Sequence, residues 1–290
     1  MTLETDDLSG TDSSQSTLRR GAVGWVLLAS LGISYVIAGD YAAWNFGLQH
    51  GGWGGLLVAV AFGFAMYFAL LATLGELATI IPDAGGGSAF AARAFGHTLG
   101  CLTGACILVE YVSAAAVVSI FLQAYLRALT GIGGPAVIIS VFVVFISIHT
   151  IGVREALRVL LAIAIVGLVG LTAFVFATVP HFDSRYLFEL PVQNVFGANR
   201  WLPMGLVGIW ATLPFGTAFF LGVEGVAMAA EETRDPHRNL PLGMTAALLV
   251  LTLFAVLLVV FGPGVIGAAR LQSAEAPSSW LSTRSTREAD

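Results

Sequence analysis

Two long apolar segments each contain a short glycine-bearing stretch with a carboxylate, Ile37-Ala38-Gly39-Asp40 in one and Leu221-Gly222-Val223-Glu224-Gly225 in the other. Glycine weakens a helix by about 1 kcal/mol relative to alanine, and a charge at mid-bilayer costs about 2.5–3.5 kcal/mol. Helix packing explains a single glycine better than it explains a matching pair of glycine–acid stretches. Matching interruptions in two spans are typical of inverted-repeat transporters, whose unwound backbone offers free N–H and C=O groups to a substrate. We therefore predict two broken transmembrane helices.

The composition is that of an integral membrane protein. Of the 290 residues, 57% are hydrophobic and 11% are charged, whereas soluble domains carry about 25% charged residues. The apolar residues form blocks long enough for helices to cross a bilayer. We predict an all-α integral membrane protein of about seven transmembrane helices, near residues 22–48, 55–81, 98–126, 134–152, 156–179, 205–230 and 240–267. The connection 180–203 is expected to include an interfacial helix.

Several other classes of protein are disfavoured by the sequence. The two cysteines, Cys101 and Cys106, lie in one apolar span and do not form a metal site or a disulfide framework. The stretch 85–88, Gly-Gly-Gly-Ser, lacks the Gly-Lys-Ser/Thr ending of a phosphate loop. There is no basic stripe for nucleic acid and no catalytic constellation. We predict no enzyme activity, no cofactor and no metal.

The two ends of the chain are polar. Residues 1–20 are acidic and rich in Ser and Thr, and we expect a disordered cytoplasmic tail there. Residues 271–290 form a second polar tail, so the transmembrane domain covers 21–270. If the N-terminus is cytoplasmic, seven arginines lie on that side and three in the opposite loops, the final tail excepted. This bias predicts a multi-pass protein of the plasma (inner) membrane with its N-terminus in the cytoplasm.

Four carboxylic acids fall within apolar spans that contain no arginine: Asp40, Glu76, Glu110 and Glu224. A buried acid needs a partner, a proton or a cation. Because the spans offer no base, the positive charge is expected from a cationic ligand or a coupled proton. Glu110 is either a protonated acid bonded to a neighbouring helix or the site of an ammonium group, with Tyr111 beside it as hydroxyl or aromatic partner.

The other acids each have two interpretations. Asp40 is an N-cap of the second half of a broken helix or part of the substrate site, and as a cap it would disfavour ligands with a carboxylate. Glu224 either makes a structural hydrogen bond or takes part in gating and proton coupling. For Glu76 a structural role is favoured, and a coupling role is the alternative. Phe219 and Phe220 either close over a bound amine by cation–π contact or pack in the core.

Three stretches resemble the amino acid–polyamine–organocation permeases. They are GELATIIPDAGG at 75–86, GVE at 222–224 followed by EETRDPHRNLP at 231–241, and GISYVIAGDYAAWNFGL at 32–48. The last stretch, together with Glu110 and Tyr111, is most similar to ethanolamine permeases. The resemblance covers about residues 20–270.

The resemblance implies a fold of two five-helix inverted repeats with helices 1 and 6 broken. It implies a first repeat at about 21–180 and a partial second repeat at about 205–270. It further implies backbone contacts to the substrate from Ile37, Ala38 and Gly39, with Phe219, Phe220 and Gly222 on the sixth-span side. Because the family core needs ten helices, we expect a product truncated after the seventh span.

Three functions are therefore carried forward. The first is secondary active uptake of a small amine, ethanolamine foremost, driven by a coupling proton or an exchange substrate. The second is an amino-acid permease, whose substrates need a carboxylate. The third is a non-transporting permease fragment that associates with partner helices. The expected partners are the substrate and the lipid bilayer, without nucleic acid, and a homo-oligomer is left open.

Overall fold

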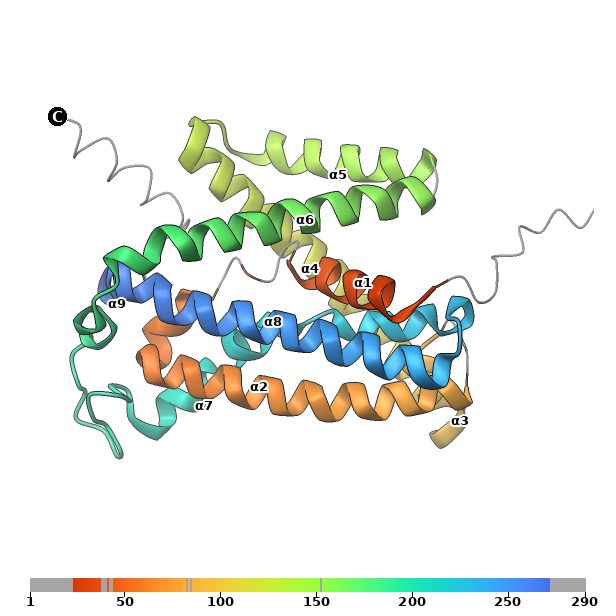
Figure 1. The fold of residues 1–290 in the computed structure, drawn as a ribbon, viewed down its shortest axis with the longest axis horizontal. Coiled ribbons are helices and arrows are strands. Elements are labelled where there is room, and N and C mark those ends of the chain that lie inside the picture. Colours follow the sequence, from red (N-terminus) through yellow and green to blue (C-terminus); the bar gives the residue numbers. More distant parts are fainter. Residues whose placement is uncertain are drawn as a thin grey trace, which may run out of the picture.

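The computed structural model describes residues 23–37, 41, 44–81, 83, 85–151 and 153–271, and this part of the chain is helical (Figure 1). One isolated parallel bridge pairs Val23 with Thr233. The all-helical fold class predicted from the sequence is confirmed. The α-helices are α1 (Trp25–Ile37), α2 (Phe46–Ile80), α3 (Gly87–Phe95), α4 (His97–Thr130), α5 (Pro135–Ile151), α6 (Val153–Thr178), α7 (Gly205–Thr217), α8 (Pro236–Ile266) and α9 (Ala268–Leu271).

From the third span onward, the apolar helices agree with the predicted spans to within a few residues. Five segments in the described part of the chain are long and apolar enough to cross a membrane: Phe46–Ile80, His97–Thr130, Arg158–His181, Gly205–Glu232 and Pro236–Ile266. α1 and α5 are shorter apolar helices. These segments support a multi-pass membrane protein.

The first predicted span, 22–48, is interrupted as predicted, because its helix ends at Ile37. The next helix, α2, begins at Phe46 and includes residues 49–54, which lie between the first two predicted spans. α2 is kinked at Gly52, where φ is +68° and ψ is −174°. A side chain there would be strained at this φ, and its Cβ would lie 2.7 Å from Cδ of Pro203. Glycine therefore permits both the kink and the close approach of the connection 180–203.

The sixth span is broken as predicted. α7 ends at Thr217 and is followed by the short 3₁₀ helix η4 (Ala218–Phe220). Gly222 then adopts a left-handed conformation with φ of +92°, and the chain continues as the 3₁₀ helix η5 (Val223–Glu232). A left-handed residue ends a helix at little cost only when it lacks a Cβ. Gly222 therefore sets the position of the break.

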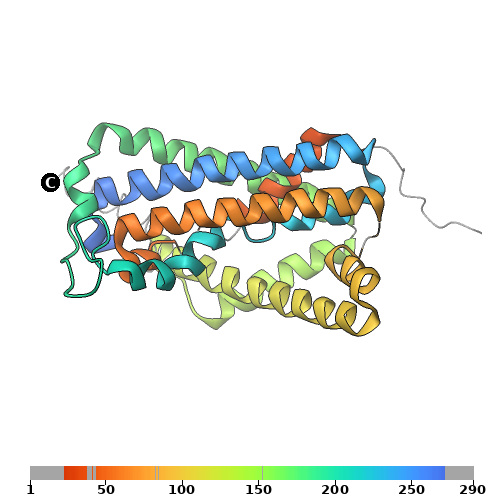
Figure 2. The same cartoon turned by 90° about the horizontal axis from the view of Figure 1, so that it is seen from below.

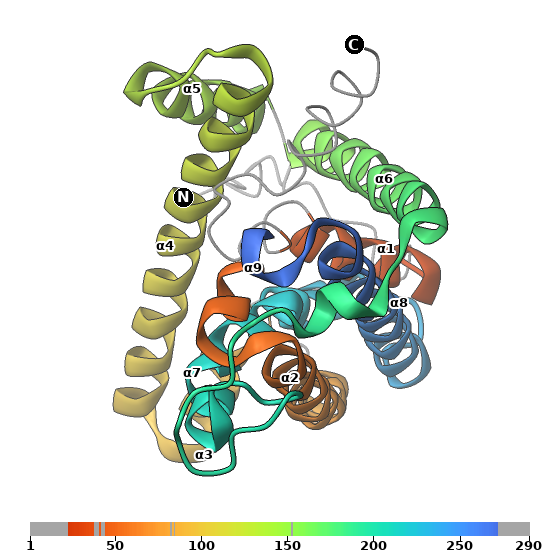
Figure 3. The ribbon, with the colours of Figure 1, turned by 90° about the vertical axis from the view of Figure 1, so that its left-hand side faces the viewer.

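The core of the molecule is a bundle of α1, α2, α7 and α8 (Figures 1 and 2). Small residues allow the close approach of these helices: a Cβ on Gly216 of α7 would lie 2.5 Å from Cβ of Ala59 in α2. A Cβ on Gly243 of α8 would lie 2.6 Å from Cβ of Leu28 in α1. Seen end-on in Figure 3, α4 and α5 lie on one flank of this bundle and α6 on another.

Three side chains near the start of the chain donate hydrogen bonds to carbonyls near its end. Tyr41 Oη donates to Leu251 O at 2.6 Å and Asn45 Nδ2 to Leu271 O at 2.9 Å. Trp53 Nε1 donates to Val259 O at 3.1 Å. The Val259 carbonyl lacks the usual donor four positions later in α8, because that residue is Pro263, which has no N–H. Trp53 supplies that donor from α2.

The connection after α6 contains two short 3₁₀ helices, η2 (Val179–His181) and η3 (Ser184–Phe188), where one interfacial helix was predicted. Pro180 and a side-chain turn account for this difference. Asp183 Oδ1 accepts from the Arg185 N–H at 2.9 Å and so fixes a local turn that competes with a longer helix. The connection packs through Trp201, whose ring centroid lies 5.1 Å from that of Trp53.

Candidate functional site

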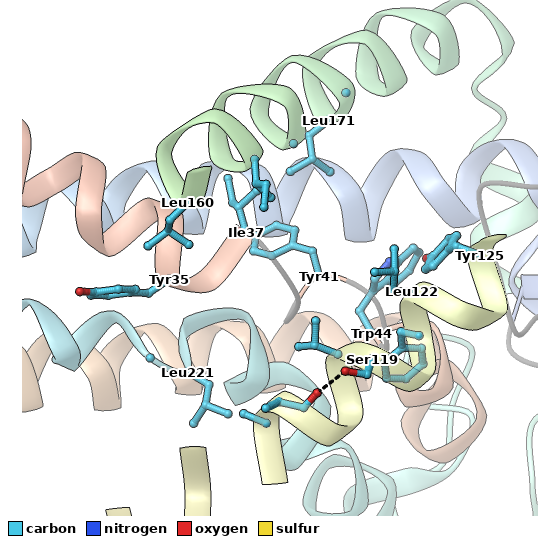
Figure 4. A pocket seen from close by; sticks show the side chains of 18 of the residues that line it. Tyr35, Ile37, Tyr41, Trp44, Ser119, Leu122, Tyr125, Leu160, Leu171 and Leu221 are labelled. Atoms are coloured by element: carbon cyan, nitrogen blue, oxygen red, sulfur yellow. Dashed lines mark hydrogen bonds between the residues drawn. The ribbon is translucent and has the colours of Figure 1, made fainter. Parts of the chain in front are cut away.

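A cavity of about 1060 Å³ lies between α1, α4, α5, α6, α8 and the break in the sixth span (Figure 4). This volume is at the upper end of the range that holds drug-sized ligands. Among the described residues that line it, Glu110 is the only charged one, and no arginine or histidine is present. The aromatic lining residues are Tyr35, Tyr41, Trp44, Tyr111, Phe121, Tyr125, Phe142, Phe145 and Phe174.

The structure brings four of the predicted site residues to this cavity. Ile37 at the end of α1, Glu110 and Tyr111 on α4, and Gly222 in the sixth-span break all line it. They come from three segments that are far apart in the sequence. Three further predicted residues, Ala38, Gly39 and Asp40, lie outside the described residues.

The sixth-span break is held by a local hydrogen bond. Oε2 of Glu224 accepts from the Gly222 N–H at 3.1 Å, and the Gly225 N–H donates to Gly222 O at 3.0 Å. Glu224 therefore makes the structural hydrogen bond that was one of its two interpretations. It does not itself line the cavity, but its carboxyl group lies within electrostatic range of Glu110.

Tyr35 is a lining residue that the sequence interpretation did not select. A Cβ on Gly225 would lie 3.4 Å from the Tyr35 ring and 3.5 Å from Oη of Tyr111, so α1, α4 and η5 meet at this point. The polar groups of Tyr35, Tyr111 and Glu110 form one end of the cavity. The sequence signal that was overlooked is a hydroxyl inside an apolar span, two residues before the predicted break at Ile37.

Phe219 and Phe220 are fully buried and do not line the cavity. The Phe219 ring packs edge-on against Tyr41, with centroids 5.0 Å apart. The Phe220 ring lies 5.7 Å from that of Tyr67 in α2. In this conformation both phenylalanines have the core-packing arrangement, because each ring is enclosed by the bundle. Their contact with a substrate stays a prediction.

Glu76 lies apart from the other acids. It is an exposed residue in the last two turns of α2 and is absent from the lining of the cavity. Its backbone carbonyl accepts from Thr79 Oγ1 at 2.7 Å. The structure therefore does not group Glu76 with Glu110 and Glu224, and its coupling role stays a prediction.

Metal-ligating side chains do not gather in the described part of the chain. No group of three or more His, Cys, Asp or Glu residues there is arranged to hold a metal ion. Cys101 and Cys106 are free and exposed on α4. The described lining residues offer the carboxyl group of Glu110, tyrosine and serine hydroxyls and aromatic rings.

The described part of the chain is a multi-pass helical bundle with a broken span beside an acid-bearing cavity. Comparison with protein families agrees. The chain belongs to the amino acid permease family, whose sequence model matches residues 26–281. This match supports the resemblance to permeases. It does not distinguish ethanolamine permeases from other members of the family, and it does not show a truncation.

Individual relatives are similar at low identity. An uncharacterised transporter from Rhizobium meliloti is 28% identical over 234 residues, which are 78% of this chain and 49% of that protein. The branched-chain amino acid permease BcaP of Bacillus subtilis is 25% identical over 295 residues, covering 94% of this chain and 61% of the relative. A D-serine/D-alanine/glycine transporter of Escherichia coli is 27% identical over 193 residues, which are 64% of this chain and 40% of that protein. The chain thus spans about half the length of these relatives.

Proposed function

We propose that this protein takes part in secondary active uptake of a small amine or amino acid across the plasma (inner) membrane, and that the ammonium group of the substrate binds Glu110. The observation that carries this proposal is the charge of the cavity. Glu110 is the only charged residue among the described lining residues. A carboxylate in apolar surroundings is stabilised by a cation, and the aromatic rings around it add cation–π attraction.

The foremost substrate is an amine without a carboxylate, such as ethanolamine. A substrate carboxylate needs backbone donors or a base. The described lining residues include no base, and the Gly222 N–H at the sixth-span break already donates to Glu224. The proposed substrate site also includes Tyr111 and Asp40. Its remaining contacts come from the backbone at the first break, Ile37, Ala38 and Gly39, and from Gly222 at the sixth-span break.

The second candidate is an amino-acid permease. It is favoured by the names of the relatives, which include a branched-chain amino acid permease and a D-serine/D-alanine/glycine transporter. In this function Asp40 is only a cap, and the backbone at the first break binds the substrate carboxylate. A third candidate is a chain that binds partner helices or ligand without flux.

The remaining parts of the proposal concern coupling and topology. The proposed coupling or gating acids are Glu224 and Glu76. Glu224 would act through its electrostatic interaction with Glu110. The driving force is a proton or an exchange substrate. The N-terminus is cytoplasmic, the first repeat spans about 21–180 and the partial second repeat about 205–270. The oligomeric state of the protein is left open.

The test is uptake of labelled ethanolamine into proteoliposomes, beside alanine and leucine. Saturable ethanolamine uptake that is lost in Glu110→Gln supports the amine carrier. Uptake of leucine or alanine but not ethanolamine favours the amino-acid permease. Binding without uptake of any of the three leaves the non-transporting chain. Glu189→Gln, which removes an exposed carboxylate outside the cavity lining, is the matched control.

A further inference from the structure

The cavity is much longer than a two-carbon amine. Along α4 its lining runs from Glu110 to Tyr125, and the fifteen helical steps between them span about 22 Å. Figure 4 shows Tyr35 at one end and Tyr125 at the other, with Tyr41 and Trp44 between them. Ethanolamine bound at Glu110 fills only the polar end of this space.

The part of the cavity beyond Glu110 is apolar and aromatic. On α4 the residues that follow Glu110 on the same helix face are Ala114, Val118 and Leu122. Tyr41 and Trp44 line the cavity from the first span, and Phe142 and Phe145 line it from α5. Apolar ligand surface that moves from water into such a space gains about 25 cal/mol per Å².

We infer that the preferred ligand is a monoamine that carries an aromatic or other large apolar group and no carboxylate, with its ammonium at Glu110 and its apolar group along α4 toward Trp44. This inference rests on the proposed function and narrows its substrate class. Among the described lining residues Glu110 alone carries a charge and binds the cation, and the length and composition of the remaining space select the apolar group. Because the Gly222 N–H already donates to Glu224, it is not available as a donor to a ligand carboxylate.

The space next to Glu110 can be filled by one substitution. Ala114 lies one turn beyond Glu110 and lines the cavity, so Ala114→Phe places a ring where the apolar group of the ligand would lie. Ala116 is exposed on the same helix and is not among the lining residues. Ala116→Phe is therefore a matched control for the added ring.

The experiment measures equilibrium binding to the full chain in lipid nanodiscs by isothermal titration calorimetry. Four probes separate charge from apolar surface and carboxylate: ethanolamine, 2-phenylethylamine, 2-phenylethanol and phenylalanine. The inference predicts that 2-phenylethylamine binds about 10-fold or more tightly than ethanolamine, as expected for burial of a phenyl group. It predicts weaker binding of the neutral alcohol and of phenylalanine. Ala114→Phe removes the advantage of 2-phenylethylamine, and Ala116→Phe keeps it.

Other results overturn the inference. Equal affinities of ethanolamine and 2-phenylethylamine, or an unchanged advantage in Ala114→Phe, refute the apolar site but leave the proposed amine carrier standing. Tighter binding of phenylalanine than of 2-phenylethylamine refutes the exclusion of a carboxylate. If neither ethanolamine nor 2-phenylethylamine binds while phenylalanine does, the inference fails together with the amine form of the proposed function.

Discussion

The hydrogen bond from Trp53 to the Val259 carbonyl makes a sharp test of how this bundle is held together. Pro263 leaves the Val259 carbonyl without the usual donor four positions later in α8, and Trp53 Nε1 supplies one at 3.1 Å. Trp53→Phe keeps an aromatic ring beside Phe188 and Trp201 but removes the donor. An unsatisfied buried carbonyl costs about 1–3 kcal/mol, and hydrogen bonds between membrane helices average about 0.6 kcal/mol. We therefore expect a loss of about 1–2 kcal/mol in the free energy of unfolding.

The assay is equilibrium unfolding by sodium dodecyl sulfate in mixed micelles, followed by circular dichroism. Trp210→Phe is the control for the loss of an indole, because Trp210 is 73% exposed on α7. Pro263→Ala restores an N–H that bonds Val259 within α8, so the cost of Trp53→Phe should fall in that background. Equal costs in both backgrounds, or a cost no greater than that of Trp210→Phe, would refute the reasoning.

Three further predictions follow from the break and the helix packing, each measured by the same unfolding assay. Gly216→Val should destabilise by about 1–3 kcal/mol, because a Cβ there would lie 2.5 Å from that of Ala59; an unchanged midpoint would show that the helices can separate freely. Gly222→Ala should cost about 1–2 kcal/mol, because φ is +92°; Gly225→Ala, whose Cβ has ordinary contacts, is its control. Glu224→Gln should be more stable than Glu224→Ala, since its amide oxygen still accepts from Gly222; equal stabilities would mean that this hydrogen bond contributes nothing.

The membrane spans and the sixth-span break were predictable because their signals are local. Length and hydropathy fix a span, and a glycine beside an acid within it marks a place where helix is costly. Gly222 carried both signals, and its left-handed conformation confirms the prediction. Residues 49–54 were left between two predicted spans, and α2 is kinked within them at Gly52. The close approach of Pro203 to this kink has no local signal, because Pro203 lies about 150 residues later in the chain.

The site was predictable in part. An acid without a base in its span pointed to Glu110, and this argument needs no tertiary structure. Tyr35 was missed because its role depends on the meeting of α1, α4 and η5 around Gly225. The burial of Phe219 and Phe220 was also open at the sequence level, because cation–π closure and core packing use the same side chains.

The central claim is that Glu110 holds the ammonium group of a ligand inside the cavity. The most direct measurement is equilibrium binding of labelled ethanolamine to the purified chain in nanodiscs, compared with Glu110→Gln and with Glu189→Gln. The account predicts that Glu110→Gln weakens binding about 10-fold or more, as expected for a lost charge-assisted interaction, and that Glu189→Gln binds as the unchanged protein does. Equal affinity of the Glu110→Gln variant would contradict it.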